Sequence, residues 1–169
     1  MGAHPLIVTA ELPEDLQAWA TSLRTAHFPP ERNYLSAHVT LFHALPPSSE
    51  AEVRGELARI CAACPPPPGR IEGLMNLGRG TAIRLSSGTM LEIRDELAGR
   101  FHGMLTPQDE HKPRLHVTVQ NKVSLEEAKA LQAELGPQVS ARDFTFKGLG
   151  LYAYKGGPWD HLASYSFRG

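Results

Sequence analysis

Two segments of the chain alternate between apolar and polar residues and share three letters. In residues 114–123, RLHVTVQNKV, the alternation puts His116 and Thr118 on one face of a predicted strand and the apolar residues on the other. The segment AHVTLF places His38 and Thr40 in the same alternation. The pattern therefore predicts two strands that each present one histidine and one threonine from the same face.

The first half of the chain contains signals for four further elements. The apolar run PLIVTA predicts a strand, and Pro13 with the acidic residues after it predicts the start of a helix. Ser49 and Glu52 have the spacing of a capping box, which predicts a second helix. Two alternating segments that meet at residues 78–80, Gly-Arg-Gly, predict a hairpin.

The second half repeats this order of elements. Apolar residues at helical spacing between Met90 and Met104 predict a helix, which is followed by the strand that contains His116. Ser124 and Glu127 form a second predicted capping box, and the last thirty residues predict two or three strands.

The repeated order indicates an internal duplication, with halves of about 1–87 and 88–169. Two repeats are too few for a solenoid, so we expect them to pack about a pseudo-twofold axis as one bilobal domain, 1–169. The predicted fold class is α+β, with antiparallel sheets and outer helices around a central cleft. That symmetry would bring both His-Val-Thr strands to the cleft.

Composition and charge narrow the classes of function. The 169 residues are 41% hydrophobic and 21% charged, as in ordinary globular domains, and the formal net charge is -1. A near-neutral chain is not expected to follow a long nucleic acid, but it can bind a small or terminal phosphate. The sequence has no apolar run long enough for a membrane span and no signal-peptide pattern, so we expect a cytoplasmic monomer without membrane contact.

The two cysteines, Cys61 and Cys64, form a single C-x-x-C pair. No second cysteine pair or close histidine pair completes a zinc site. Both cysteines continue the apolar stripe of the predicted second helix, where cysteine packs as a small hydrophobic residue. We therefore predict core packing for them and no metal or cofactor in the protein.

The paired motifs His38-Val39-Thr40-Leu41 and His116-Val117-Thr118-Val119 resemble those of the 2H phosphoesterase superfamily, also called LigT-like or 2'-5' RNA ligase-like proteins. The resemblance extends over nearly the whole chain, because the duplicated order of elements fits the family's bilobal fold. It implies an enzyme of the RNA 2',3'-cyclic phosphodiesterase type. The expected partner is a nucleotide or RNA terminus that carries a cyclic or 2'-5' phosphodiester.

Two imidazoles suit this reaction because a histidine pKa near 6.5 allows one ring to be neutral while the other is charged. We expect His38 and His116 to be the catalytic acid and base, without an assignment of either role to either residue. The hydroxyls of Thr40 and Thr118 are predicted to hold the non-bridging phosphate oxygens. The resemblance implies a 2'-phosphate product.

Four further residues are candidates for contacts with the substrate. Phe42 and Gln120 occupy equivalent places beyond the two threonines, so alternation predicts that they line the base side of the cleft. Tyr34 and Arg114 lie on the histidine faces of their strands and are phosphate or base candidates. The segment 154–159, YKGGPW, is a candidate for the mouth of the cleft.

Three alternatives remain open at this stage. His38 and His116 can be zinc ligands if a third ligand such as His43, His111 or His161 joins them. The cleft can instead bind nucleotides or RNA ends without breaking a bond. The family resemblance also leaves open a 2'-5' RNA ligase activity.

Overall fold

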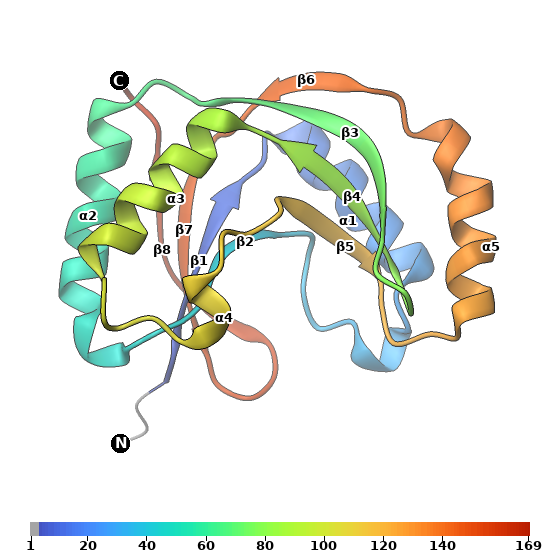
Figure 1. The fold of residues 1–169 in the computed structure, drawn as a ribbon, viewed down its shortest axis with the longest axis horizontal. Coiled ribbons are helices and arrows are strands. Elements are labelled where there is room, and N and C mark those ends of the chain that lie inside the picture. Colours follow the sequence, from blue (N-terminus) through green and yellow to red (C-terminus); the bar gives the residue numbers. More distant parts are fainter. Residues whose placement is uncertain (1–3) are drawn as a thin grey trace.

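The fold, described here from a computed structural model of residues 4–169, consists of two antiparallel four-stranded sheets flanked by helices (Figure 1). The first sheet has the strand order β2 (Val39–Leu45), β1 (Leu6–Glu11), β7 (Gly148–Tyr154), β8 (Trp159–Ser166). The second has the strand order β5 (His116–Gln120), β4 (Thr81–Ser86), β3 (Pro68–Asn76), β6 (Arg142–Thr145). The predicted α+β class is confirmed. Residues 1–3, which belong to the segment inspected for a signal peptide, lie outside the described residues.

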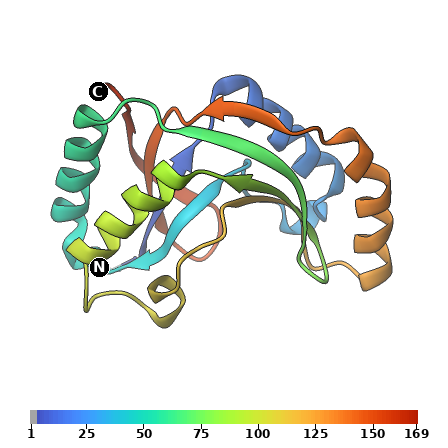
Figure 2. The ribbon, with the colours of Figure 1, turned by 45° about the horizontal axis from the view of Figure 1, so that its top comes forward.

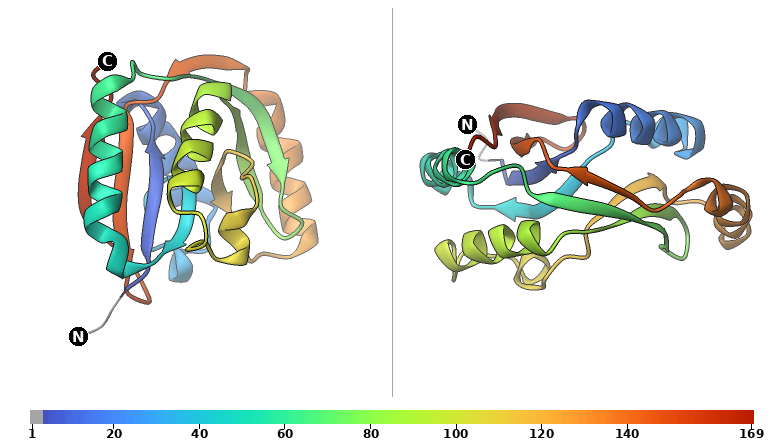
Figure 3. Two further views of the ribbon diagram at one scale, coloured as in Figure 1. Left: turned by 60° about the vertical axis from the view of Figure 1, so that its left-hand side comes forward. Right: turned by 90° about the horizontal axis from the view of Figure 1, so that it is seen from above.

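Helices cover both sheets and fill the space beside them (Figure 3). Helix α2 packs on β7 and β8, α5 packs on β3 and β4, and α1 packs on β5. The α-helices are α1 (Glu14–His27), α2 (Glu50–Ala63), α3 (Gly88–Arg100), α4 (Pro107–Glu110) and α5 (Leu125–Leu135). Three single 3₁₀ turns are η1 (Pro30–Arg32), η2 (Pro47–Ser49) and η3 (Gly136–Gln138).

Each sheet contains strands from both halves of the chain. In the first sheet β1 pairs with β7, and in the second β4 pairs with β5 and β3 pairs with β6. The edge strand β2 and its neighbour β1 correspond to the edge strand β5 and its neighbour β4. We infer that the second repeat begins with β4, so the repeat boundary falls in the hairpin turn at 77–80 and not at 87/88.

The two predicted capping boxes have different outcomes. The Ser124 hydroxyl accepts the Glu127 backbone N–H at 3.1 Å and caps α5, as predicted. Ser49 precedes α2, but its hydroxyl instead donates to the Pro46 carbonyl at 2.7 Å. The 3₁₀ turn η2 runs directly into α2 and leaves Ser49 without the extended backbone that a capping serine needs.

A continuous apolar core joins the two sheets and their helices. Its largest fully buried side chains include Phe42, Phe101 and Phe146. Cys61 is buried in this core, and burial raises the pKa of its thiol to about 11, so it stays a neutral thiol near pH 7. Among residues 4–169, no helix is long and apolar enough to cross a membrane.

Candidate functional site

The two His-Val-Thr motifs lie on the edge strands β2 and β5, which run beside each other where the sheets meet (Figure 2). His38 directly precedes β2 and His116 is the first residue of β5. Both histidines and both threonines, Thr40 and Thr118, are partly exposed, whereas the valines between them are buried. The alternation inferred from the sequence therefore holds through the three motif residues of each strand.

Both histidine rings are anchored in the same way. Nδ1 of His38 lies 2.9 Å from the Ser36 carbonyl oxygen, and Nδ1 of His116 lies 2.6 Å from the Arg114 carbonyl oxygen. A carbonyl oxygen only accepts, so Nδ1 carries the hydrogen in each ring. Nε2 is therefore the atom left to exchange a proton with a ligand.

The environment of His38 favours its neutral form. Burial is the main reason why the pKa of His38 falls to about 4, and the positive charges of Arg24, His116 and His43 lower it further. The hydrogen bond to the Ser36 carbonyl acts in the opposite direction. His116 and His43 are thus both close enough to His38 to influence its charge.

An aromatic wall lies on the His38 side of the cleft. The Trp159 ring packs against the His38 ring with centroids 4.5 Å apart, and Tyr152 lies 5.7 Å from Trp159. These rings help to line a pocket of about 300 Å³, which Thr9 and Tyr34 also border. Trp159 belongs to the predicted YKGGPW segment, so this part of the segment does lie at the cleft.

A second pocket, of about 320 Å³, continues past Tyr34 and Trp159. We call it the cationic pocket because Arg24, Arg32 and Lys122 line it. None of these three cations has a carboxylate within ion-pair distance among the described residues, and no acidic residue lines the pocket. Positive charge is thus concentrated locally on a chain whose formal net charge is -1.

Arg114 lies on the other side of the site, near His116. It lines a pocket of about 340 Å³ together with Arg84. Arg84 is the cross-strand partner of His116 in the β4–β5 ladder, so the two side chains share one face of the sheet. Arg84 was not among the sequence candidates, because only the β4–β5 register brings it beside the motif.

Strand β2 contains a β-bulge directly after its threonine. Thr40 is opposite Thr9 of β1, but Phe42 is opposite Val8, so Leu41 is an extra residue in β2. The bulge reverses the alternation. Phe42 joins the core face of the sheet and is fully buried.

Strand β5 carries the equivalent bulge. Thr118 is opposite Ala82 of β4, whereas Gln120 is opposite Thr81, which leaves Val119 as the extra residue. Gln120 is consequently buried, and its side-chain oxygen accepts the Thr81 hydroxyl at 2.9 Å. The same irregularity at the same place in both strands supports the inferred duplication.

These bulges change the set of candidate residues. Phe42 and Gln120 were expected to line the cleft, but they face the core and present almost no surface to a ligand. The next residue of β2, His43, consequently lies on the side of His38 and Thr40, and its counterpart in the second motif is Asn121, which directly follows β5. His43, which the sequence indicated only as a possible third zinc ligand, is 45% exposed at its side chain. A bulge is set by pairing with the neighbouring strand, so alternation within one strand gave no signal for it.

Two buried arginines form equivalent hydrogen bonds to the backbones of the two motif strands. Arg24 of α1 donates to the Thr118 carbonyl of β5 at 3.0 Å, and Arg94 of α3 donates to the Leu41 carbonyl of β2 at 3.2 Å. Each arginine therefore reaches from one repeat to the edge strand of the other. Because β2 and β5 are edge strands, these bonds satisfy carbonyls that no neighbouring strand pairs.

Within residues 4–169, no three His, Cys, Asp or Glu side chains are close enough together to hold a metal ion.

The family model of the 2'-5' RNA ligase superfamily matches residues 12–158. Similar solved structures include TT0787 of Thermus thermophilus, with 17% identity, a TM-score of 0.69 and coverage of 98% of each chain. Escherichia coli LigT complexed with NADP+ has 15% identity and a TM-score of 0.61 and covers 98% of this chain and 99% of its own. LigT complexed with 3'-AMP has 15% identity and a TM-score of 0.56 and covers 99% of this chain and 100% of its own. No curated protein sequence matched.

Two four-stranded sheets whose edge strands carry paired His-x-Thr motifs define a LigT-like fold. The chain belongs to the 2'-5' RNA ligase superfamily, the superfamily of 2H phosphoesterases and 2'-5' RNA ligase-like proteins. The predicted family is thereby confirmed.

Proposed function

We propose that this protein is a phosphodiesterase that hydrolyses a 2',3'-cyclic phosphate of a nucleotide or RNA end without a metal ion. The observation that carries the proposal is the matched anchoring of two histidines on adjoining edge strands, each with Nε2 left free. One proton acceptor and one proton donor on opposite sides of a phosphorus atom are what in-line hydrolysis requires.

His38 is the general base in this mechanism. A pKa lowered to about 4 keeps its ring neutral near pH 7, so Nε2 can accept a proton from the attacking water. The water oxygen bonds to phosphorus as the bond to one ribose oxygen breaks, and His116 gives that oxygen a proton. The expected product is the 2'-phosphate.

Thr40 and Thr118 act as donors to the phosphate. Each is two residues beyond its histidine on the same face, and each retains exposed surface. Negative charge grows on the non-bridging oxygens as water attacks, and a hydroxyl placed there stabilises the transition state more than the ground state.

The pockets on the His38 side accommodate the rest of the substrate. Tyr34 and Trp159 border both the His38 pocket and the cationic pocket, so they are placed to stack on a base between them. A further phosphate would lie in the cationic pocket beside Arg32 and Lys122. Arg114, with Arg84, would bind the substrate on the His116 side.

Turnover of defined substrates tests the proposed function. Purified protein is incubated with adenosine 2',3'-cyclic phosphate, a cyclic-phosphate-ended oligonucleotide and ADP-ribose cyclic phosphate, and products are followed by phosphorus NMR. We expect conversion of at least one substrate to a monoester, with activity retained after dialysis against a chelator. Affinity without turnover would instead identify a nucleotide-binding protein, and joining of RNA ends would identify a ligase.

The pH dependence of the reaction follows from the lowered pKa of His38. In free enzyme the base is lost only as the pH falls through about 4, so kcat/KM should stay level from neutral pH down to that region. A bound phosphate anion raises the pKa of the neighbouring ring, so the acid limb of kcat should lie at higher pH. An acid limb of kcat/KM near 6.5, with circular dichroism unchanged across the range, would remove His38 as the base.

A further inference from the structure

A third histidine shares the cleft side of β2 with the first motif. The bulge at Leu41 places His43 on the same side as His38 and Thr40, although the spacing in the sequence would put it on the opposite one. Its side chain is 45% exposed, and its charge contributes to the environment of His38. Bulges beside active sites commonly re-aim one side chain in this way.

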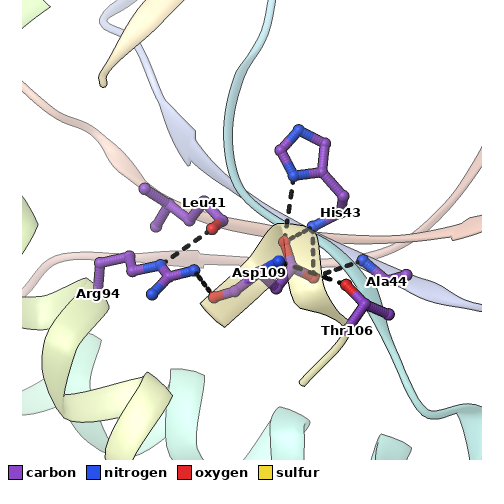
Figure 4. A network of polar contacts seen from close by, with 6 residues as sticks. All are labelled: Leu41, His43, Ala44, Arg94, Thr106 and Asp109. Atoms are coloured by element: carbon purple, nitrogen blue, oxygen red, sulfur yellow. Dashed lines mark hydrogen bonds and ion pairs between the residues drawn. The ribbon is translucent and has the colours of Figure 1, made fainter. Parts of the chain in front are cut away.

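A buried carboxylate fixes the orientation of the His43 ring (Figure 4). Asp109 of α4 is fully buried at its side chain, and one of its oxygens lies 3.1 Å from Nδ1 of His43. The backbone N–H groups of His43 and Ala44 also donate to this carboxylate, at 2.8 Å and 2.9 Å. Although burial alone would raise the pKa of Asp109, these hydrogen bonds lower it, so the carboxylate is charged. An ionised carboxylate only accepts, so Nδ1 holds a hydrogen and Nε2 is presented to the cleft.

The support of Asp109 itself comes from the second repeat. The guanidinium of Arg94 donates to the Asp109 carbonyl and stacks over the Phe42 ring, 4.2 Å from its centroid. The Thr106 hydroxyl accepts the Asp109 backbone N–H at 3.3 Å. Asp109 lies between the His43 ring and the Arg94 guanidinium (Figure 4). Asp109, which holds the His43 ring, is therefore itself held by Arg94 of α3 and by Thr106.

This arrangement has no counterpart on the other motif strand. The residue equivalent to His43 is Asn121, which directly follows β5, and its side-chain oxygen accepts the Lys122 backbone N–H at 2.9 Å. The two halves of the site thus match in histidine and threonine but differ one residue beyond each bulge. A symmetrical pair of His-x-Thr motifs gives a substrate no preferred direction, whereas a third group on one side does.

We propose that His43, oriented by Asp109, binds an oxygen of the cyclic phosphate through Nε2 and fixes the direction in which the nucleotide lies. With Nδ1 held by the Asp109 carboxylate, the ring donates through Nε2 to the phosphate from the β2 side. The contact holds one ribose oxygen towards His116, so His43 determines which ester bond breaks. This inference rests on the proposed cyclic phosphodiesterase activity and adds a specificity-determining residue to it.

The test compares His43→Ala, His43→Gln and a control, His102→Ala, with adenosine 2',3'-cyclic phosphate as substrate. His102 is an exposed histidine between α3 and α4 with no side-chain hydrogen bond among the described contacts. We expect His43→Ala to lower kcat/KM by about 10- to 100-fold, like the loss of one donor to the reacting phosphate. Phosphorus NMR should also show a larger share of the minor monoester. His43→Gln keeps a side-chain donor and should recover part of both losses, and the control should match the wild type.

The ratio of the two monoester products distinguishes a contact between His43 and the substrate from a purely structural role of His43. Destabilisation of the fold would lower the rate without changing which ester bond breaks. Calorimetric binding of adenosine 3'-monophosphate gives a second readout that needs no turnover. If the wild type hydrolyses no cyclic phosphate, the proposed function fails, but weaker binding by His43→Ala than by His102→Ala still supports the contact. Unchanged affinity of His43→Ala, or an unchanged product ratio in an active His43→Ala variant, overturns the inference.

Discussion

Alanine in place of His38 or His116 should lower kcat by about 10²- to 10⁴-fold, the usual contribution of one general acid or base. Each substitution removes the Nε2 of one motif histidine, whose ring is oriented by the bond between Nδ1 and a backbone carbonyl. Both rings are partly exposed, so the variants should remain folded. The measurement is single-turnover hydrolysis of the best substrate from the NMR screen, with circular dichroism to check the fold.

A variant that lacks both histidines gives a second test of whether they act together. Residues that act as a unit in one reaction are strongly non-additive, so His38→Ala combined with His116→Ala should lose less than the product of the two single effects. His102→Ala again serves as the control. Full activity in both single variants would show that the reaction does not use this pair of rings.

Replacing Asp109 by alanine should lower the free energy of unfolding by about 2–4 kcal/mol, because buried donors would lose their acceptor. The backbone N–H groups of His43 and Ala44 lie on an edge strand and are paired by this carboxylate. Urea denaturation at pH 7 measures the loss. Asp95→Ala is the matched control: Asp95 is an exposed aspartate with a long contact of 3.9 Å to Lys112, and its loss should change stability by no more than about 0.5 kcal/mol.

The free energies of unfolding of the wild type and Asp109→Ala should become more similar at acid pH. The pKa of Asp109 is lowered in the folded protein, so its contribution is fully present above the ordinary pKa of an unfolded aspartate, about 3.9. This contribution to stability is lost as the pH falls through the lowered pKa of Asp109 in the folded protein. A difference in free energy of unfolding that is small at pH 7, or that does not decrease at acid pH, would contradict the role of Asp109 as a charged acceptor that stabilises the fold.

The identity and order of the elements followed from local patterns. Each predicted helix or strand depends on a few neighbouring residues, such as the spacing of apolar side chains or the Ser124 cap on α5. The Ser49 box failed because a 3₁₀ turn formed in front of α2, and that turn depends on the prolines before it rather than on the box. We infer a repeat boundary in the hairpin turn from the strand order of the two sheets, which the linear order of elements does not reveal.

The paired His-x-Thr motifs and their place on strands were readable from the sequence, because three residues in one strand alternate regardless of what surrounds them. The sequence did not reveal which face of the sheet the residues beyond these motifs point to. The bulges at Leu41 and Val119 arise from pairing with β1 and β4, and they turn Phe42 and Gln120 into the core.

The amino-acid sequence by itself determined the α+β class and the two imidazole-hydroxyl pairs, since these rest on short-range periodicity and on repeated spacing. Only the tertiary structure placed Arg84 beside His116, gathered Arg24, Arg32 and Lys122 next to Trp159, and brought Asp109 to His43 across 66 residues of chain. The physical reason is that strand register and the burial of a charge depend on partners that are distant in the chain, so no local pattern encodes them.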